Sequence, residues 1–354
     1  MRQYPNRFPD PKGTSGPEGD LTMNISQPAS GSRRGLFNMK AWLLRDDRIQ
    51  ANGVKLAIVL LAIWGSLGVE NFASVGNFQA IMYSVAAIGV AAVGMAFITL
   101  SGNLFMLSMA ATAALSTVVF AHTLHLGLLP AVVLVAVMGS VIGALQGVAV
   151  GIGKVNPIIT TIAVASIIMG VGSYVSRGLT VVGEGDATWL GVGKLFSVIP
   201  NQLVILVVFA ILADYLVQRT RFGRELRLIG LNSTTAYLSG IRVGRTLIIS
   251  FIVAGFAAAL AGSLFASQSA QGNFKLAAGL DFDAIAAVLV GGVSIRGGSG
   301  RVIDAVYGAI FLAIITNLLL IQGLSFEIQL MVKGVVVVLA VILGAVILRM
   351  RKFK

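Results

Sequence analysis

Residues 80–100 read AIMYSVAAIGVAAVGMAFITL, a run of 21 residues without a charged side chain. A helix needs about 20 apolar residues to cross the hydrocarbon core of a bilayer. The whole chain of 354 residues shares this character, with 56% hydrophobic residues, 11% charged residues and a mean hydropathy of +0.91. A soluble domain would carry about 25% charged residues. The sequence therefore predicts an all-α polytopic membrane protein.

Other apolar segments of similar length follow the first along the chain. They predict about ten transmembrane helices. The expected segments are 54–72, 80–100, 104–121, 127–151, 157–176, 201–218, 245–270, 283–296, 302–323 and 328–348. The segment 283–296 is short for a crossing, so we expect it to be tilted, broken or re-entrant. The connection 177–200 is the longest and most polar of the external loops.

The distribution of basic residues predicts the orientation. Ten crossings put both termini on one side. That side carries 22 basic residues: nine up to Lys55, then Lys154, six arginines within 219–245, two at 296 and 301, and four within 349–354. The opposite side carries 3. Cytoplasmic loops are enriched in Lys and Arg, so both termini are expected in the cytoplasm. The same topology explains the net charge of +12 without nucleic acid.

The ends of the chain differ from its centre. Residues 1–50 form a cytoplasmic N-terminal tail that lacks the apolar stretch of a signal peptide. Within it, 1–35 is expected to be largely disordered, and 36–50 could form a short helix on the membrane surface. Residues 51–350 are expected to form the transmembrane domain, followed by a basic cytoplasmic C-terminus at 351–354.

The sequence offers little for an enzyme. It has no GxxxxGK[ST] loop, so ATP hydrolysis is expected on another chain. It has no cysteine, and the pair His122 and His125 at a segment end is more consistent with an incidental spacing than with a metal site. We expect no catalytic residue, no metal and no cofactor bound by this chain.

Few ionisable residues fall within the expected spans. Lys333 is the most deeply placed, and it either serves a function inside the membrane or extends its ammonium toward the interface. Asp214 and Asp304 are expected to pair with Arg219 or Arg301. No series of mid-span Asp, Glu or His residues occurs, which argues against a proton-coupled carrier.

Neutral polar residues are the candidates for a path taken by an uncharged polar solute. Each could instead form a hydrogen bond between helices. The candidates are Asn103, Thr160, Thr161, Gln268 and Asn317, with Ser166 and Ser269 beside them.

Four glycines recur every fourth residue at 139, 143, 147 and 151. This spacing places them on one face of a helix, where the absence of side chains allows another backbone to approach closely. The pattern predicts tight helix packing, with a mobile hinge as the alternative.

The segment 219–245, RTRFGRELRLIGLNSTTAYLSGIRVGR, is too polar to span a membrane. Asn232 is suited to cap a helix, residues 233–239 can form about two turns, and Gly240 suits the left-handed position after a helix end. Ala236, Tyr237 and Leu238 would give this helix an apolar face. The pattern favours docking into a groove on a soluble partner. The alternative is a solvated basic loop.

Three stretches resemble the permeases of ribose-type ABC transporters, the class 2 carbohydrate uptake family within the branched-chain amino acid, ribose, xylose and galactose permease superfamily. They are RTRFGRELRLIGLNSTTAYLSGI at 219–241, QGVAVGIGKVNPIITTIAVASIIMG at 146–170 and LDFDAIAAVLVGGVSIRGGSGRVIDAVYGAIFLAIITNLL at 280–319. The resemblance spans residues 54–348. The chain departs from the family at LSGNLFMLSMA (100–110), where an acidic motif is common, and at LNSTTA (231–236), which lacks the usual acid.

The resemblance implies a type II-like ABC importer permease fold in the bacterial inner membrane. It implies a second permease copy or a paralogue, an ATP-binding subunit that carries ATP and Mg, and a periplasmic solute-binding protein that delivers a monosaccharide, a sugar alcohol or a related polar solute. The residues implied in coupling to the ATPase are Arg221, Phe222, Gly223, Arg224, Asn232, Ala236, Leu238, Ser239 and Gly240.

Three alternatives remain open. An ABC permease for branched-chain amino acids or nucleosides shares the general layout. An ion-coupled secondary transporter built of inverted repeats is disfavoured by the scarcity of charges within the spans. A membrane scaffold without transport activity is the third.

Overall fold

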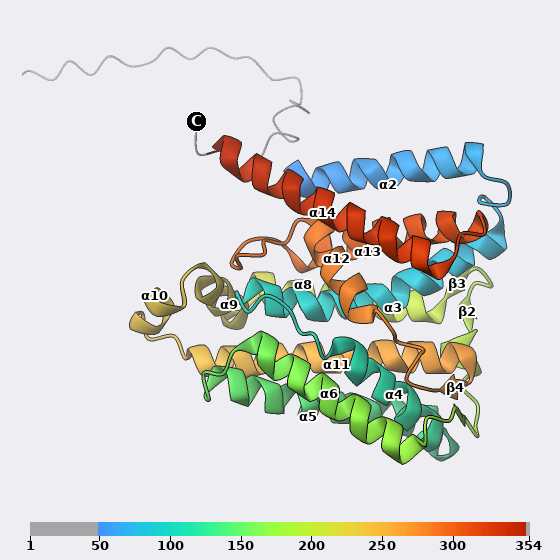
Figure 1. The fold of residues 1–354 in the computed structure, drawn as a ribbon, viewed down its shortest axis with the longest axis horizontal. Helices are drawn as coiled ribbons and strands as arrows, with labels where there is room; N and C mark the ends of the chain where they lie inside the picture. The colour runs from blue at the N-terminus through green and yellow to red at the C-terminus, as the bar shows by residue number, and fades with distance from the viewer. Residues whose placement is uncertain (1–48, 352–354) are drawn as a thin grey trace, which may run out of the picture. The chain divides into compact units, whose positions relative to one another are not determined.

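The computed structural model describes residues 49–351 and shows a bundle of long helices (Figure 1). The predicted N-terminal tail and its surface helix lie outside the described residues, except that Ile49 and Gln50 begin the first helix. The last three residues of the basic C-terminus also lie outside them.

The long helices run lengthwise through the bundle, and short elements connect them (Figure 1). The long helices are α2 (Ile49–Gly68), α3 (Val75–Leu100), α4 (Met109–Thr123), α5 (Leu128–Gly151), α6 (Pro157–Ser176), α8 (Asn201–Arg219), α11 (Val243–Ser269), α13 (Val302–Ile321) and α14 (Phe326–Arg351). The shorter helices are η2 (Leu124–Leu126), α7 (Thr188–Gly191), α9 (Arg221–Leu231), α10 (Ser233–Leu238) and α12 (Leu280–Gly291).

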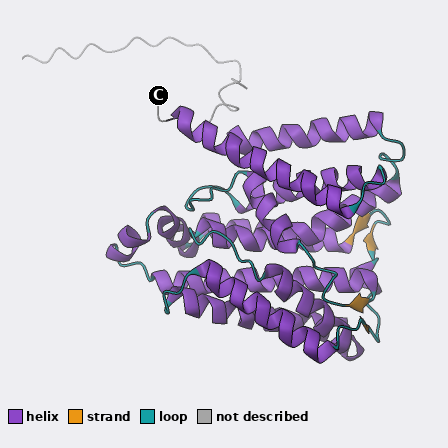
Figure 2. Ribbon diagram, in the orientation of Figure 1, coloured by secondary structure: helices purple, strands orange, loops and turns teal. Residues whose placement is uncertain are grey.

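Four two-residue strands gather at one end of the bundle, which we call the strand end (Figure 2). β1 (Val181–Val182) pairs antiparallel with β4 (Gln271–Gly272), and β2 (Lys194–Leu195) pairs antiparallel with β3 (Ile199–Pro200). The predicted external loop 177–200 therefore contains three of the strands and α7. The opposite end carries α9 and α10, and we call it the α10 end.

Each predicted apolar segment overlaps one of the helices α2 to α6, α8 or α11 to α14. Seven helices of the described region are long and apolar enough to cross a membrane, with η2 counted as an extension of α4. They are α3, α4, α5, α6, α8, α11 and α13. α12 has 12 residues, and at 1.5 Å per residue it is about 18 Å long, too short to cross a core of about 30 Å by itself. The structure thus agrees with the expectation that 283–296 is not an ordinary crossing.

The stretch quoted first lies in α3, at the centre of the bundle. Every residue of α3 from Val85 to Leu100 is buried. The helix packs against α8, α11, α12 and α13. A helix that is apolar on all sides can be stable when neighbours surround it, which explains why this run carries no polar face. The helix begins at Ser74, whose Oγ accepts the N–H of Asn77 at 3.2 Å.

The glycine spacing in α5 produces the predicted close packing, here against α11. An added Cβ on Gly143 would lie 2.2 Å from the carbonyl oxygen of Phe251, and one on Gly139 would lie 2.4 Å from Cβ of Ala259. An added Cβ on Gly151 would likewise approach the backbone of Gly244 too closely. Only residues without a side chain allow the two backbones to lie this close. The packing prediction is confirmed.

Several expected boundaries differ from the observed helix ends, and the third segment illustrates the cause. The segment 104–121 was predicted as continuous, but α4 begins only at Met109. Gly102 and Leu104 adopt positive φ values of 80° and 58°, which end the helical path after α3. The hydroxyl of Thr99 donates to the carbonyl of Leu104 at 3.0 Å and stabilises this irregular turn.

Candidate functional site

The arginine-rich segment forms two helices rather than the single short helix that was predicted. α9 begins after Thr220, whose Oγ1 accepts the N–H of Gly223 at 3.4 Å. Leu226 and Ile229 are buried, whereas Arg221 and Arg224 are exposed. α9 is thus amphipathic, with Arg221 and Arg224 directed away from the bundle and Arg227 half-buried. The helical spacing of Phe222, Leu226 and Ile229 in the sequence would have revealed it.

α9 is fixed to the transmembrane helices. The ring of Phe222 stacks on Phe97 of α3 with the ring centroids 6.2 Å apart. Thr246 of α11 donates its hydroxyl hydrogen to the carboxylate of Glu225 at 3.2 Å. Gly230 lies so close to the carbonyl oxygen of Leu100 that a Cβ would approach it to 2.1 Å. α9 is therefore in direct contact with both α3 and α11.

α10 has the predicted cap at its N-terminal end and the predicted left-handed glycine after its C-terminal end. Asn232 Oδ1 accepts the N–H of Thr235 at 3.0 Å. The helix ends at Leu238, and Gly240 follows with φ +80°, in the left-handed region. The N–H of Ile241 returns to the carbonyl of Ala236 at 3.1 Å. These contacts confirm the capped helix and shorten it by one residue, because Ser239 lies just beyond its end.

The outward face of α10 differs from the prediction in one residue. Ala236 is only 3% exposed and packs into the core of the chain, so its assignment to an outer apolar face was wrong. Tyr237 and Leu238 are 70% and 79% exposed. Among the other residues implied in coupling, Phe222 and Gly223 lie on the inner side of α9. The exposed ones are Arg221, Arg224, Asn232, Ser239 and Gly240.

The five candidates for a solute path are not brought together. Asn103, Thr160 and Thr161 lie toward the α10 end, just after α3 and in the first turn of α6. Asn103 Nδ2 donates to Ser101 Oγ at 2.8 Å, and each threonine hydroxyl donates to a carbonyl of its own chain segment. Their side chains have local partners in this arrangement.

The remaining two candidates lie toward the strand end. Gln268 is exposed near the end of α11. Asn317 of α13 is 7% exposed, and its Nδ2 donates to Asn77 Oδ1 in the first turn of α3 at 2.6 Å. Asn317 therefore forms a hydrogen bond between helices, as the alternative reading of these residues allows.

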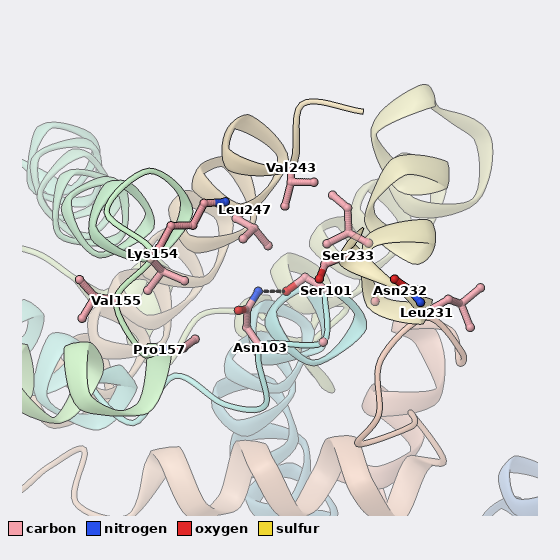
Figure 3. Close-up of a pocket in the computed structure, with 14 residues that line it drawn as sticks. Ser101, Asn103, Lys154, Val155, Pro157, Leu231, Asn232, Ser233, Val243 and Leu247 are labelled. Carbon is pink, nitrogen blue, oxygen red and sulfur yellow. Dashed lines mark hydrogen bonds between the residues drawn. The ribbon is translucent and has the colours of Figure 1, made fainter. Parts of the chain in front are cut away.

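A cavity of about 480 Å³ opens at the α10 end (Figure 3). It is enclosed by the turn after α3, the α5–α6 turn, the α9–α10 junction and the start of α11. Its polar lining includes Ser101, Asn103, Lys154, Asn232 and Ser233. One path candidate, Asn103, and one coupling candidate, Asn232, line this same cavity.

Two ion pairs join helices within the described region. Asp214 of α8 accepts from Arg301, with Oδ2 and NH2 3.3 Å apart, which confirms one expected pairing. Lys333 of α14 donates to Asp283 of α12 at 2.8 Å. Within the described residues, the ammonium of Lys333 therefore has a partner on a neighbouring helix. This partner could not be predicted from the local sequence, because the two residues lie 50 positions apart.

A second buried polar group escaped the sequence analysis. Ser108, just before α4, donates its hydroxyl hydrogen to Gln146 Oε1 of α5 at 2.8 Å. Gln146 is 1% exposed and Thr112 is fully buried, and neither Gln146 Nε2 nor Thr112 Oγ1 has a partner among the described residues. A glutamine within the otherwise apolar segment 127–151 was the available signal.

Comparisons with known proteins fit this architecture. The profile of the family described as "Branched-chain amino acid transport system / permease component" matches residues 77–341. The ribose import permease protein RbsC of Escherichia coli K12 is 32% identical over 325 residues, which cover 90% of this chain and 98% of that protein. The L-arabinose transport system permease protein AraH of the same strain is 30% identical over 323 residues, covering 90% and 96%. The probable ABC transporter permease protein YphD is 34% identical over 306 residues, covering 85% and 91%. No solved structure matches the chain.

Proposed function

Since this chain belongs to the family of branched-chain amino acid transport system permease components, we propose that it is the membrane-spanning subunit of an ABC importer for a sugar. The solute would be a monosaccharide, a sugar alcohol or a related polar molecule, because the relatives described above are named for ribose and L-arabinose. The chain is a transport subunit and not an enzyme. ATP and Mg would bind to a partner chain.

The observation that carries this proposal is the exposed pair Tyr237 and Leu238 on a capped helix that is anchored to the bundle. An apolar pair on a short projecting helix suits a groove on a soluble partner. That partner would be the ATP-binding subunit. Arg221 and Arg224 on the outer side of α9, together with Asn232, Ser239 and Gly240, would surround the contact.

The proposed topology has ten crossings, with both termini and the α10 end in the cytoplasm and the protein in the bacterial inner membrane. The excess of basic residues on the N-terminal side supports this orientation. α12 would complete its crossing with the irregular segments on either side. Such backbone is tolerated at membrane depth where protein surrounds it, and most of α12 is buried.

The strand end would then face the periplasm and receive the solute-binding protein. A second copy or a paralogue would complete the pathway. Asn103, Thr160, Thr161, Gln268 and Asn317 remain our candidates for polar contacts along it. Gln268 and Asn317 would lie near the entrance, and the other three would lie near the exit.

The anchoring of α9 suggests how ATP would drive transport. Closure of two ATP-binding subunits would displace α10, and α9 would transmit this displacement to α3 through Phe97 and to α11 through Thr246. Packed helices shift between discrete arrangements rather than deforming continuously. The bundle would thereby alternate between an outward and an inward opening.

Uptake into proteoliposomes tests the function. The chain would be reconstituted with its ATP-binding and solute-binding partners, and labelled ribose, arabinose and leucine would be compared. We expect sugar uptake that requires ATP and is insensitive to an uncoupler. Uptake without ATP that collapses with the uncoupler would instead indicate an ion-coupled carrier. Leucine uptake would favour the second candidate, a branched-chain amino acid permease, which the family description supports.

A further inference from the structure

The cavity at the α10 end carries one positive charge, on Lys154, that the transport of a neutral sugar does not require. Lys154 is the charged residue among those that line it, and no carboxylate contributes to its wall. In the described part of the chain, Lys154 takes part in neither ion pair. Its backbone has φ +56°, an uncommon conformation for a lysine. The α5–α6 turn thus holds an unpaired ammonium group at the edge of a polar cavity.

The rest of the wall also suits an anion. The cavity is lined by Val243, the first residue of α11, and this helix start has no side-chain cap. Pro157 of α6 also lines the cavity, but the two N–H groups that follow it already bind Asn156 Oδ1. The N-terminal ends of helices carry a partial positive charge and favour negatively charged groups. Ser233 adds a hydroxyl, and Asn232, whose Oδ1 caps α10, lines the same wall. Figure 3 shows Lys154, Asn103 and Ser233 entering the cavity from three different segments.

We propose that this cavity binds a phosphate ester, with Lys154 on one side of the phosphate and the Asn232–Ser233 junction on the other. Lysine is a common phosphate ligand because its ammonium acts as a compact point charge. Val150, Ile229 and Leu247 form an apolar part of the lining that would contact the carbon portion of the ester. A soluble phosphorylated metabolite and a phospholipid headgroup share this chemistry.

The position of the cavity suggests that a bound ligand would regulate the movement of α10. Asn232 both lines the cavity and caps α10. A phosphate held between Lys154 and this junction would tie the α5–α6 turn to α10 and restrict the movement of α10. This regulatory effect rests on the proposed coupling role of α10. Binding of the phosphate ester does not depend on that role, so binding is measured in an assay without transport.

The test uses the full chain in nanodiscs of neutral phosphatidylcholine. The thermal unfolding midpoint is recorded while glycerol 3-phosphate is added. Glycerol serves as the uncharged control, and sodium chloride at the same ionic strength serves as the control for salt. A second set of nanodiscs contains phosphatidylglycerol and no added ester. The variants are Lys154→Gln, the charge-conserving Lys154→Arg, and Lys275→Gln, which removes an exposed positive charge at the strand end.

Glycerol 3-phosphate should raise the midpoint of the wild type, of Lys154→Arg and of Lys275→Gln. Lys154→Gln should need about tenfold more ester for the same rise, the effect of losing one hydrogen bond to a charged group. If phosphatidylglycerol alone raises the midpoint, with the same dependence on Lys154, the ligand is a lipid headgroup. Three results would each overturn the proposal. The first is an unfolding midpoint that rises with neither glycerol 3-phosphate nor phosphatidylglycerol. The second is an equally weakened response to the ester in Lys154→Gln and Lys275→Gln, and the third is an equal rise of the midpoint with glycerol.

Discussion

Lys333 Nζ lies 2.8 Å from Asp283 Oδ1 and 3.1 Å from Oδ2, so one ammonium contacts both oxygens of one carboxylate. The pair joins α14 to the short helix α12. The two side chains are 13% and 18% exposed, which means that neither charge is well solvated. Removing one partner would leave the other charge unpaired inside the bundle.

Lys333→Met should therefore destabilise the chain by about 3 kcal/mol, as breaking other buried ion pairs does. The midpoint of urea unfolding in detergent micelles measures this loss. Combining Lys333→Met with Asp283→Leu removes both charges and should recover most of the stability. If the single variant is as stable as the wild type, the pair contributes nothing to the packing of α14.

Gly143→Ala should separate α5 from α11. The added Cβ would lie 2.2 Å from the carbonyl oxygen of Phe251, so the backbones must move apart, at a cost of about 2 kcal/mol. The matched control is Gly170→Ala in α6, where an added Cβ meets no atom within 4 Å. The control should gain about 0.5 kcal/mol from the better helix propensity of alanine. Equal unfolding midpoints for the two variants would argue against the close packing.

Gly240→Pro should reduce ATP-driven uptake at least about tenfold, because the end of α10 cannot form. Proline cannot adopt φ +80°, and it lacks the N–H that Gly240 donates to Tyr237 at 3.0 Å. Gly240→Asn is the control, since asparagine tolerates the left-handed region and retains the N–H. Both variants should reach the membrane in wild-type amounts. Normal uptake by Gly240→Pro would show that the shape of this helix end is not needed.

Leu238→Asp should weaken association with the ATP-binding subunit about 30-fold, the effect of losing a central contact in an interface. Leu238 is 79% exposed, so the change should not disturb the fold of the chain itself. Co-purification from membranes measures the association. Leu195→Asp, in β2 at the strand end, makes the same chemical change and should co-purify normally. A loss of the ATP-binding subunit in both variants would point to a general folding defect.

Much of the helical layout was available from the sequence, because long apolar runs have few alternatives in a bilayer. The glycines at 139–151 predicted close packing, and Asn232 and Gly240 predicted the ends of α10 through local backbone chemistry. These features depend on residues that lie near one another in the chain.

Features that depend on distant residues were missed. Asp283 becomes the partner of Lys333 only when α12 folds beside α14, and Gln146 meets Ser108 only when α5 packs near the start of α4. The burial of Ala236 likewise depends on how α10 lies on the bundle. α9 was missed for a different reason. Its arginines are typical of a solvated basic loop, whereas Phe222, Leu226 and Ile229 have the spacing of an amphipathic helix.

The central claim is that α10 contacts the ATP-binding subunit in the cytoplasm. A photoreactive amino acid at position 238 tests it most directly, with position 196 as the comparison, because Phe196 is 85% exposed at the strand end. The whole transporter is irradiated in membranes, and the cross-linked partners are identified by mass spectrometry. We expect the probe at 238 to capture the ATP-binding subunit and the probe at 196 not to capture it. Capture of that subunit from position 196 and not from position 238 would contradict both the coupling role of α10 and the proposed orientation.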